Sequence, residues 1–366
     1  MRLSSVEVIP YALPFKEPYV TARGALERRE MVLLRVRDED GVVGLGEAVP
    51  LALRGGIGMR DVVRELEAWG QHGEDQALSA PEVQALSAPS RCAVGTALMD
   101  SRGRRVGKKA GEGGRDEAVQ CNATLVAGPA GAVAAEAERW ARDGFTTFKL
   151  KLGAETASTR LEEGLTRSRG SGDVEMVRAV REALGAGVRI RVDANEAWDL
   201  ETATATLAAL EPFEVELAEQ PVAGLEAMAA LAAGTSIPLA ADESVATLAE
   251  AEEAVALGAC AYTGIKLSKV GGPEEALAIA DVLPAYVTSA LDGPVGIAAA
   301  AQVALSLAET GHPERLHLAH GLATQRLFAS TIAAVECEVR DGSLHLPPGP
   351  GLGVEVDEEA LQAHRI

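Results

Sequence analysis

Three acidic residues recur in this 366-residue chain at intervals that match one β-strand plus one α-helix. Asp193, Glu219 and Asp242 each close a short apolar segment, at spacings of 26 and 23 residues. The carboxyl ends of parallel strands in a barrel meet at one face, so we expect these side chains to share a mouth. Three carboxylates at close range repel one another unless a positive charge lies among them. The spacing therefore predicts a cation site.

The ligand chemistry indicates which cation this would be. Carboxylate oxygens select a hard ion, and a few carboxylates that leave positions for water or substrate oxygens suit Mg²⁺ better than zinc. A single segment such as "RIRVDANEAWD", residues 189 to 199, would not support this interpretation. Asp and Asn after a strand are usually turn residues that bond their own backbone. The regular repetition favours the metal site.

Lysines flank the acidic residues on both sides. Lys149 and Lys151 are two residues apart, so they share one face of a strand, and Lys266 follows Asp242 by 24 residues. A lysine near other cations and partly removed from water has a lowered pKa and can act as a base near neutral pH. We expect Lys266 to face Lys151 across the barrel and Lys269 to point away.

A cation between two opposed lysines suits removal of a proton next to a carboxylate, because the ion stabilises the resulting enediolate. We expect Asn195, on the same face as Asp193, to orient a ligand or the substrate. Ser289, after a later strand, could bond the substrate, and Arg23 in "VTARG" could bind a substrate carboxylate. A serine packed into a turn and a surface arginine are the competing interpretations of these last two.

The elements that must position these residues form a regular series. From residue 119 to about 337, short apolar strands alternate with Ala-rich amphipathic helices, which is typical of consecutive βα units. We predict a (β/α)7β modified TIM barrel. Its strands are expected in "VQCNATLV", "TFKLKL", "VRIRVDAN", "EVELAEQP", "IPLAADES", "YTGIKLSK" and "AYVTSAL", with "RLHLAHG" as the eighth.

The remaining sequence predicts an α+β capping domain over residues 1 to 118, completed by the tail at about 338 to 366. "MVLLRVRDEDGVVGLGEA" reads as a hairpin that turns at Asp40-Gly41, and helical patterns run from about Arg60 to Gly103. The Pro- and Gly-rich tail is expected to pack against this domain. The polar, glycine-dotted residues 153 to 173 are expected to be a surface insertion.

Composition limits the partners. With a formal net charge of -20 and a pI near 4.8, the chain should repel nucleic acid and acidic membrane surfaces. The four cysteines show no CxxC pair, and we expect neither zinc nor disulfides. His317 and His320 are expected to be ordinary structural histidines. The first residues lack a secretory pattern, so we expect a cytoplasmic protein with a small-molecule carboxylate substrate. The sequence does not give the oligomeric state, and a homo-oligomer is one possibility.

Taken together, these segments resemble the enolase superfamily, to which mandelate racemase belongs, in its muconate lactonising subgroup. The matching pieces are "FKLKLG", "RVDANEAW", "LAEQP", "AADES" and "GIKLSKVGG", which span residues 145 to 272 in order. The resemblance implies that the three acidic residues bind Mg²⁺. It also implies that Lys151 and Lys266 are the acid/base pair and that Lys149 supports them.

Secondary motifs resemble the o-succinylbenzoate synthase family of menaquinone biosynthesis. They are "PYVTARGALERREMVLLRVRDEDG", "GLGEAVPL", "VTSALDGPVGIAAA" and "LAHGLAT". This resemblance implies a dehydratase, in which Lys151 takes the proton α to the carboxylate and returns it to the departing hydroxyl. Racemases of N-acylamino acids and dipeptide epimerases share the same core motifs and remain the alternative.

The sequence departs from the family pattern at two places, and two other classes of protein are alternatives to this interpretation. The insertion at 153 to 173 follows the KxK strand, and "PLALRGGIG" offers no aromatic wall for a ring. A lysine that forms a Schiff base with a carbonyl substrate is a different possible chemistry, but it does not require three carboxylates one repeat apart. A non-catalytic binding barrel would need no general base.

Overall fold

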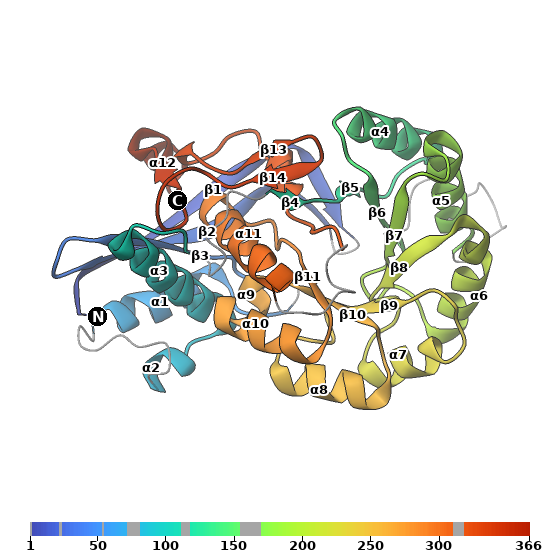
Figure 1. Cartoon of the computed structure of the whole chain (residues 1–366), viewed down its shortest axis with the longest axis horizontal. Coiled ribbons are helices and arrows are strands. Elements are labelled where there is room, and N and C mark those ends of the chain that lie inside the picture. Colours follow the sequence, from blue (N-terminus) through green and yellow to red (C-terminus); the bar gives the residue numbers. More distant parts are fainter. Residues whose placement is uncertain are drawn as a thin grey trace.

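The computed structural model describes residues 2–21, 24–52, 55–71, 81–110, 118–153, 170–309 and 318–366. Arg23, His317 and most of the expected insertion therefore lie outside the described residues. Figure 1 shows two parts, an antiparallel sheet with its helices and a curved row of parallel strands with helices along its outer side. Among the described helices, none is both long and apolar enough to span a bilayer.

The N-terminal part contains a three-stranded antiparallel sheet, β1 (Leu3–Thr21), β2 (Gly24–Asp38) and β3 (Val43–Ala48). The predicted turn is confirmed, since Asp38 Oδ1 accepts hydrogen bonds from the amides of Asp40 and Val42. Three helices follow, α1 (Met59–Gly70), α2 (Pro81–Gln84) and α3 (Ala88–Val106). Gly44 and Gly46 have no side chains to separate α3 from β3, and a Cβ atom at either would collide with a carbonyl of α3.

The second part contains a seven-stranded sheet whose strands follow chain order and pair in parallel. Parallel bridges of Cys121 to His320 and of Thr288 to Gly321 place the eighth segment between the two edges. The predicted (β/α)7β modified TIM barrel is confirmed, with shorter strands than expected. The strands are β5 (Ala123–Leu125), β6 (Thr147–Lys151), β7 (Arg189–Asp193), β8 (Val215–Glu219), β9 (Leu239–Ala241), β10 (Tyr262–Ile265) and β11 (Ala285–Val287).

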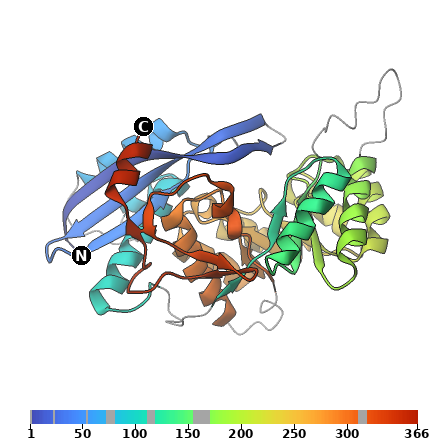
Figure 2. The ribbon, with the colours of Figure 1, turned by 90° about the horizontal axis from the view of Figure 1, so that it is seen from above.

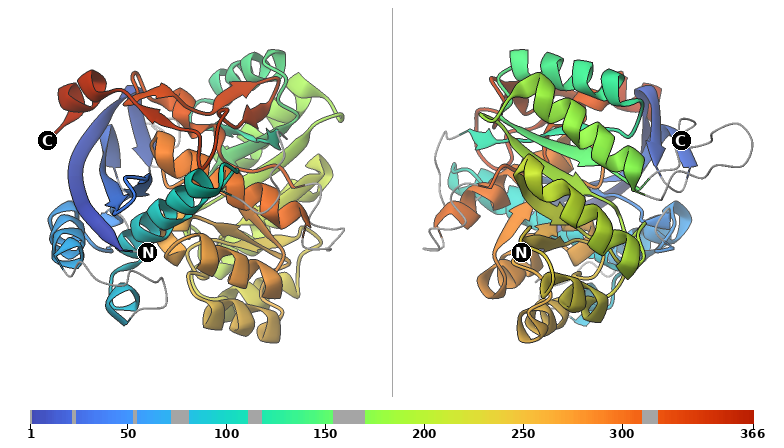
Figure 3. Two further views of the ribbon diagram at one scale, coloured as in Figure 1. Left: turned by 60° about the vertical axis from the view of Figure 1, so that its left-hand side comes forward. Right: turned by 90° about the vertical axis from the view of Figure 1, so that its right-hand side faces the viewer.

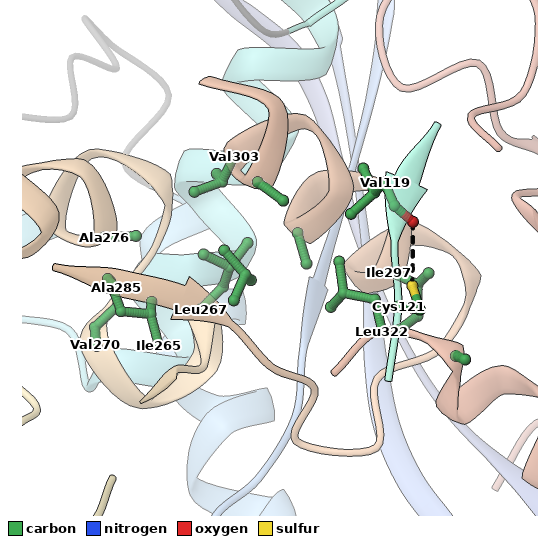
Figure 4. Packing of buried hydrophobic residues seen from close by; sticks show 14 of the residues in the cluster. Val119, Cys121, Ile265, Leu267, Val270, Ala276, Ala285, Ile297, Val303 and Leu322 are labelled. Carbon is green, nitrogen blue, oxygen red and sulfur yellow. Dashed lines mark hydrogen bonds between the residues drawn. The ribbon is translucent and has the colours of Figure 1, made fainter. Parts of the chain in front are cut away.

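Helices between the strands cover the outside of the sheet, as Figure 3 shows for the first of them. They are α4 (Ala130–Arg142), α5 (Ser171–Leu184), α6 (Leu200–Leu210), α7 (Leu225–Ala232), α8 (Leu248–Leu257), α9 (Leu267–Val270), α10 (Pro273–Val282) and α11 (Pro294–Glu309). The described residues also include the 3-10 helices η3 (Glu211–Phe213) and η5 (Ala323–Leu327). In Figure 4, Ile297 and Val303 of α11 lie in the same apolar cluster as Ile265, Ala285 and Leu322.

The tail contacts both parts. Its strands β13 (Glu338–Arg340) and β14 (Ser343–His345) pair with β4 (Val119–Gln120) at the entry to the barrel, while β12 (Ala333–Val335) pairs with β15 (Glu355–Val356). The last helix, α12 (Glu358–His364), lies against β1 (Figure 2). The tail thus packs on the N-terminal part, as expected. The exact domain boundaries stay a prediction.

A buried glutamate joins the capping sheet to the barrel. Glu47 of β3 accepts hydrogen bonds from the Gly293 amide, at the start of α11 (2.6 Å), and from the Tyr11 hydroxyl of β1 (2.7 Å). Its side chain lies near the buried Asp292 carboxylate. Burial, followed by the charge of Asp292, raises the pKa of Glu47 to about 7. The contact between the two parts therefore contains an acid that favours its protonated form.

This pKa predicts how stability depends on pH. The folded-state value lies above the ordinary 4.5, so the stability linked to Glu47 is complete below about pH 4.5 and is lost as the pH rises towards 7. The shift corresponds to a free energy on the order of 3 kcal/mol. Urea denaturation of the wild type and Glu47→Gln at pH 5 and pH 8 should show the variant gaining relative stability at the higher pH. An equal difference at both pH values would contradict this account of Glu47.

Candidate active site

The barrel brings the predicted acidic residues and lysines to the carboxyl ends of neighbouring strands. Asp193 is the last residue of β7 and Glu219 is the last residue of β8, and these two positions pair in the parallel register. Asp242 follows β9 directly. All three side chains are buried, with at most 1% of their surface exposed. Such burial of charged groups requires compensating charge nearby.

The lysine pair on β6 supplies part of that charge. Lys149 Nζ lies 2.6 Å from Glu219 Oε1 and 2.8 Å from Asp193 Oδ2, so it joins the ends of β7 and β8. Lys151 Nζ lies 2.5 Å from Asp193 Oδ2 and donates to Asn195 Oδ1 at 2.8 Å. Both ammonium groups therefore point to the same face of β6, as their spacing predicts.

Asn195 lies within this cluster, and its side chain is bonded to other residues of the site. Its Nδ2 donates to Glu243 Oε1 at 3.1 Å, while its Oδ1 accepts from Lys151. The backbone of Asn195 is left-handed, with φ of 47°, which asparagine tolerates better than most residues. Asn195 thus links the turn after β7 to the turn after β9, and its predicted contact with substrate stays a prediction.

On the far side of the site, two lysines contact one acidic residue. Lys266, the residue after β10, forms an ion pair with Asp242 Oδ2. Lys269 Nζ lies 3.0 Å from Asp242 Oδ1 and also donates to the backbone carbonyls of Asp242 and Gly264. The expectation that Lys269 points away was wrong. The strand ends at Ile265 and helix α9 starts at Leu267, so helical geometry turns Lys269 back towards the site.

The pKa values of the lysines depend on the neighbouring carboxylates. Burial lowers the pKa of Lys151, but Asp193, Tyr19 and Glu219 together outweigh burial and the net pKa is raised. The same balance, through Asp193 and Glu219, raises the pKa of Lys149. Neighbouring carboxylates thus stabilise the ammonium form of both lysines more than burial opposes it. The lowered pKa was expected for a lysine near a bound cation, and it stays a prediction.

The pKa values of two of the site's carboxyl groups are shifted in opposite directions. Burial raises the pKa of Asp193, but Lys149 and Lys151 outweigh it, and the net pKa lies far below the usual value. Burial and the charge of Asp193 raise the pKa of Glu219 instead. The influence of Asp242 on both residues shows that the three acids lie within one electrostatic neighbourhood.

The donor set fits a hard divalent cation in its chemistry, because three buried carboxylates with partial mutual repulsion are available at one mouth. Within the described residues, no three His, Cys, Asp or Glu side chains converge closely enough to hold one ion. Lysine ammonium groups contact each of the three acids instead. Closing the carboxylates around Mg²⁺ would require these ion pairs to rearrange.

Gln220 is a positioning residue that the sequence analysis did not single out, although it lies within "LAEQP". It is fully buried and has a left-handed backbone with φ of 38°. Its Oε1 accepts from the amides of Asp242 (2.8 Å) and Ser244 (3.1 Å), and its Nε2 donates to Val222 O and Ser244 Oγ. Gln220 therefore fixes the backbone that carries Asp242.

The remaining predicted residues have other surroundings. Ser289 Oγ donates to Asp292 Oδ2 at 2.8 Å and accepts from the Asp292 amide at 2.9 Å, so it is engaged in a local turn. His320 is partly buried near Arg191, and removal of its ring from water together with that charge lowers its pKa to about 3. Its Nδ1 accepts from the Val287 amide, which suits the structural role expected for it. Contact of Ser289 with substrate stays a prediction.

An aromatic group near the site was missed in the sequence. Phe15 stacks on Tyr19, with ring centroids 5.6 Å apart, and on Phe328 at 5.0 Å. Tyr19 is within electrostatic reach of Lys151. The segment "PFKEPY" in β1 carries two of these rings. Phe15 and Phe328 are buried, so this aromatic stack belongs to the core where β1 meets the segment after the barrel.

Beneath the acidic residues, a buried tyrosine bonds one of them. The Tyr286 hydroxyl of β11 donates to Glu219 Oε2 at 2.5 Å, and its ring lies 5.0 Å from the Arg191 guanidinium carbon. Arg191 in turn donates to Glu216 Oε2 at 2.5 Å and to Ala319 O at 2.7 Å. Burial and the Glu219 charge hold the pKa of Tyr286 well above its usual value. The phenol therefore remains a hydrogen-bond donor.

A barrel with this cap and this set of lysines and acids is typical of one superfamily, and comparison with known proteins bears this out. Residues 132–360 match the enolase C-terminal domain-like family, and residues 4–109 match the N-terminal domain of mandelate racemase and muconate lactonizing enzyme. The chain belongs to the enolase superfamily.

The relatives differ from one another in the reaction that their names give. The chain is 30% identical to a D-Ala-D/L-Ala epimerase of Cytophaga hutchinsonii over 83% of its length and 84% of that protein's. It is 28% identical to muconate cycloisomerase 1 of Pseudomonas putida, over 97% of this chain and 96% of the other. A muconate lactonizing enzyme from Pseudomonas fluorescens, solved with muconolactone, superposes with a TM-score of 0.88 at 28% identity, covering 100% and 99% of the two chains.

A dipeptide epimerase from Cytophaga hutchinsonii, solved with Mg and the dipeptide D-Ala-L-Val, superposes with a TM-score of 0.86 at 25% identity, covering 99% of this chain and 98% of the other. The relatives therefore include epimerases and cycloisomerases. The expected resemblance to the enolase superfamily is confirmed, and the resemblance to o-succinylbenzoate synthase stays a prediction.

The role of Gln220 can be tested through stability. Gln220→Leu removes Oε1, the single acceptor of the Asp242 and Ser244 amides, and should lower the free energy of unfolding by about 2–6 kcal/mol, at about 1–3 kcal/mol for each of the two unsatisfied amides. Urea denaturation measures this change. Thr288→Val is the control, because the buried Thr288 hydroxyl has no hydrogen-bond partner among the described residues. Equal stability of the two variants would show that Gln220 does not hold this turn.

Proposed function

We propose that this chain is a Mg²⁺-dependent enzyme that removes a proton α to a carboxylate. The main support for this proposal is that Lys151 and Lys266 each form an ion pair with a different acidic residue of one buried cluster. Lys151 ends β6 and Lys266 follows β10, four strands further along the sheet. In an eight-stranded barrel, two positions that are four strands apart lie on opposite sides. A substrate carbon between them could therefore be reached from either face.

The residues divide the chemistry among them. Asp193, Glu219 and Asp242 would hold the Mg²⁺ ion, which when bound supplies positive charge that stabilises the enediolate oxygens. Lys151 takes the α-proton, and the ammonium group of Lys266 stabilises the opposite side of the enediolate. Lys149, bonded to Asp193 and Glu219, keeps these two acids in position.

For the particular reaction, we propose the dehydration catalysed by o-succinylbenzoate synthases. The α C–H bond of a cyclohexadiene carboxylate breaks and its electron pair enters the enediolate. The enediolate then expels the neighbouring hydroxyl, which takes the proton from Lys151 and leaves as water. The secondary motifs that resemble this family, among them "VTSALDGPVGIAAA" and "LAHGLAT", support this choice.

A second candidate is epimerisation of a dipeptide or an N-acylamino acid. Here Lys151 would remove the proton from one face and Lys266 would return one to the other face. The epimerases among the relatives support this candidate as directly as the secondary motifs support the first. The two reactions share the enediolate and differ in whether a leaving group is present.

One experiment separates these reactions. The protein is incubated with Mg²⁺ in D₂O with the cyclohexadiene substrate, an N-succinylamino acid, a dipeptide or muconate, and each reaction is followed by NMR. We expect dehydration of the first compound. Deuterium incorporation with inversion of the amino acid or dipeptide would replace the lyase with the epimerase, and conversion of muconate would indicate the cycloisomerase. Borohydride trapping of a keto substrate without exchange of any compound would overturn the proposal.

The base can be tested by substitution. Lys151→Ala should lower kcat about 10²–10⁴-fold, the usual contribution of a positioned general base, with an unchanged fold by circular dichroism. Lys108→Ala, at an exposed lysine on the capping domain, is the matched control and should retain full activity. Activity of Lys151→Ala close to that of the wild type would remove Lys151 from its role.

Metal dependence has its own test. Excess EDTA should abolish turnover, and added Mg²⁺ should restore it. Asp193→Asn should weaken Mg²⁺ binding in calorimetric titration, since an amide oxygen carries no full negative charge. A titration curve identical to that of the wild type would count against Asp193 as a ligand.

A further inference from the structure

The Glu219 carboxylate differs from the other two acids in how its oxygens are engaged. Oε1 accepts from Lys149 at 2.6 Å, and Oε2 accepts from the Tyr286 hydroxyl at 2.5 Å. Within the part of the chain that the structure describes, Asp193 and Asp242 form ion pairs with lysines. A cation can replace a lysine ammonium at a carboxylate oxygen without a change of charge, whereas replacing the phenol would leave its buried hydroxyl without this acceptor. One Glu219 oxygen is therefore engaged by a neutral, buried donor.

Tyr286 is held firmly enough to impose this arrangement. The side chain is fully buried and packs in the barrel interior with Leu217, Ala240 and Leu318. Its ring lies beneath the guanidinium of Arg191, which is itself fixed by Glu216 and the Ala319 carbonyl. A buried ring in such a stack cannot turn without disturbing its neighbours.

We propose that Tyr286 is a positioning residue that makes Glu219 a one-oxygen ligand and so favours Mg²⁺ over Ca²⁺. This inference rests on the proposed magnesium site. Ca²⁺ commonly takes both oxygens of a carboxylate in a flexible shell of six to eight ligands, whereas Mg²⁺ requires a compact octahedron of single oxygens. The phenol occupies one acceptor site of Oε2 and holds the carboxylate in one orientation, in which Oε1 is the oxygen that faces the lysine. The hydroxyl thereby disfavours the two-oxygen binding mode that Ca²⁺ commonly uses.

The test is Tyr286→Phe, which removes only the hydroxyl. The dissociation constants of the intact protein for Mg²⁺ and for Ca²⁺ are measured by isothermal titration calorimetry without substrate. Loss of a hydrogen bond to a metal ligand typically weakens metal binding about 10–100-fold, and we expect Mg²⁺ affinity to fall within this range. Ca²⁺ affinity should fall less or rise, so that the Mg²⁺ preference decreases at least about tenfold.

Tyr262→Phe provides a matched control. Tyr262 of β10 packs against the same interior cluster, and the hydrogen bonds described for Glu219 do not involve it. The control should keep both dissociation constants of the wild type. Circular dichroism and thermal melting establish that both variants are folded, and a purely structural role of Tyr286 would lower the two affinities together without changing their ratio.

The outcomes separate this inference from the proposed function. If the wild type binds neither cation, the magnesium site and this inference both fail. If the wild type prefers Mg²⁺ and Tyr286→Phe keeps the same preference, only the role of Tyr286 is overturned. Should Tyr286→Phe fail to fold, Tyr286→Trp, which fills the space with a ring whose N–H has a different position, is tested for the same ratio. An unchanged ratio in the folded variant likewise overturns the inference.

Discussion

The constraint on which the site depends is charge balance in a place that water scarcely reaches. Asp193, Glu219 and Asp242 are almost fully buried at neighbouring strand ends, and isolated buried carboxylates would be costly. The structure balances them with lysines from β6 and from the segment after β10. The same lysines are those proposed to transfer the proton. Charge compensation and catalysis thus use one set of residues, and the protonation of each lysine depends on what else neutralises the acids.

The barrel makes this balance possible because it fixes the strand ends in register. Lys151 pairs with Asp193, and Asp193 pairs with Glu219, along adjacent parallel strands. Gln220 then ties the end of β8 to the backbone of Asp242 on the next loop. Glu219 is held from more distant strands, by Lys149 of β6 and Tyr286 of β11. The register thus brings the three acids to one mouth, and a bound cation would replace some of their ion pairs with lysine.

Much of this architecture could be predicted from the sequence, because the repeated strand–helix pattern and the ends of the strands are local signals. Lys149, Lys151 and the three acids were found in this way. Lys269 was misplaced because a four-residue helix begins immediately after the strand, and alternation no longer applies there. Tyr286, in the middle of an apolar strand, carries no local signal of function. Its bond to Glu219 depends on packing across the barrel interior between strands that are not neighbours.

The fold alone does not select one reaction. Relatives named as dipeptide epimerases and as muconate cycloisomerases share the fold with this chain. In this chain, Glu47 anchors the capping sheet to the start of α11. Because the turn that contains Ser289 and Asp292 immediately precedes α11, the same anchor links the cap to the end of the seventh barrel strand. A change in how the cap packs on the barrel would therefore reach this strand end through Glu47, whereas the ion pairs of Asp193, Glu219 and Asp242 are made within the barrel.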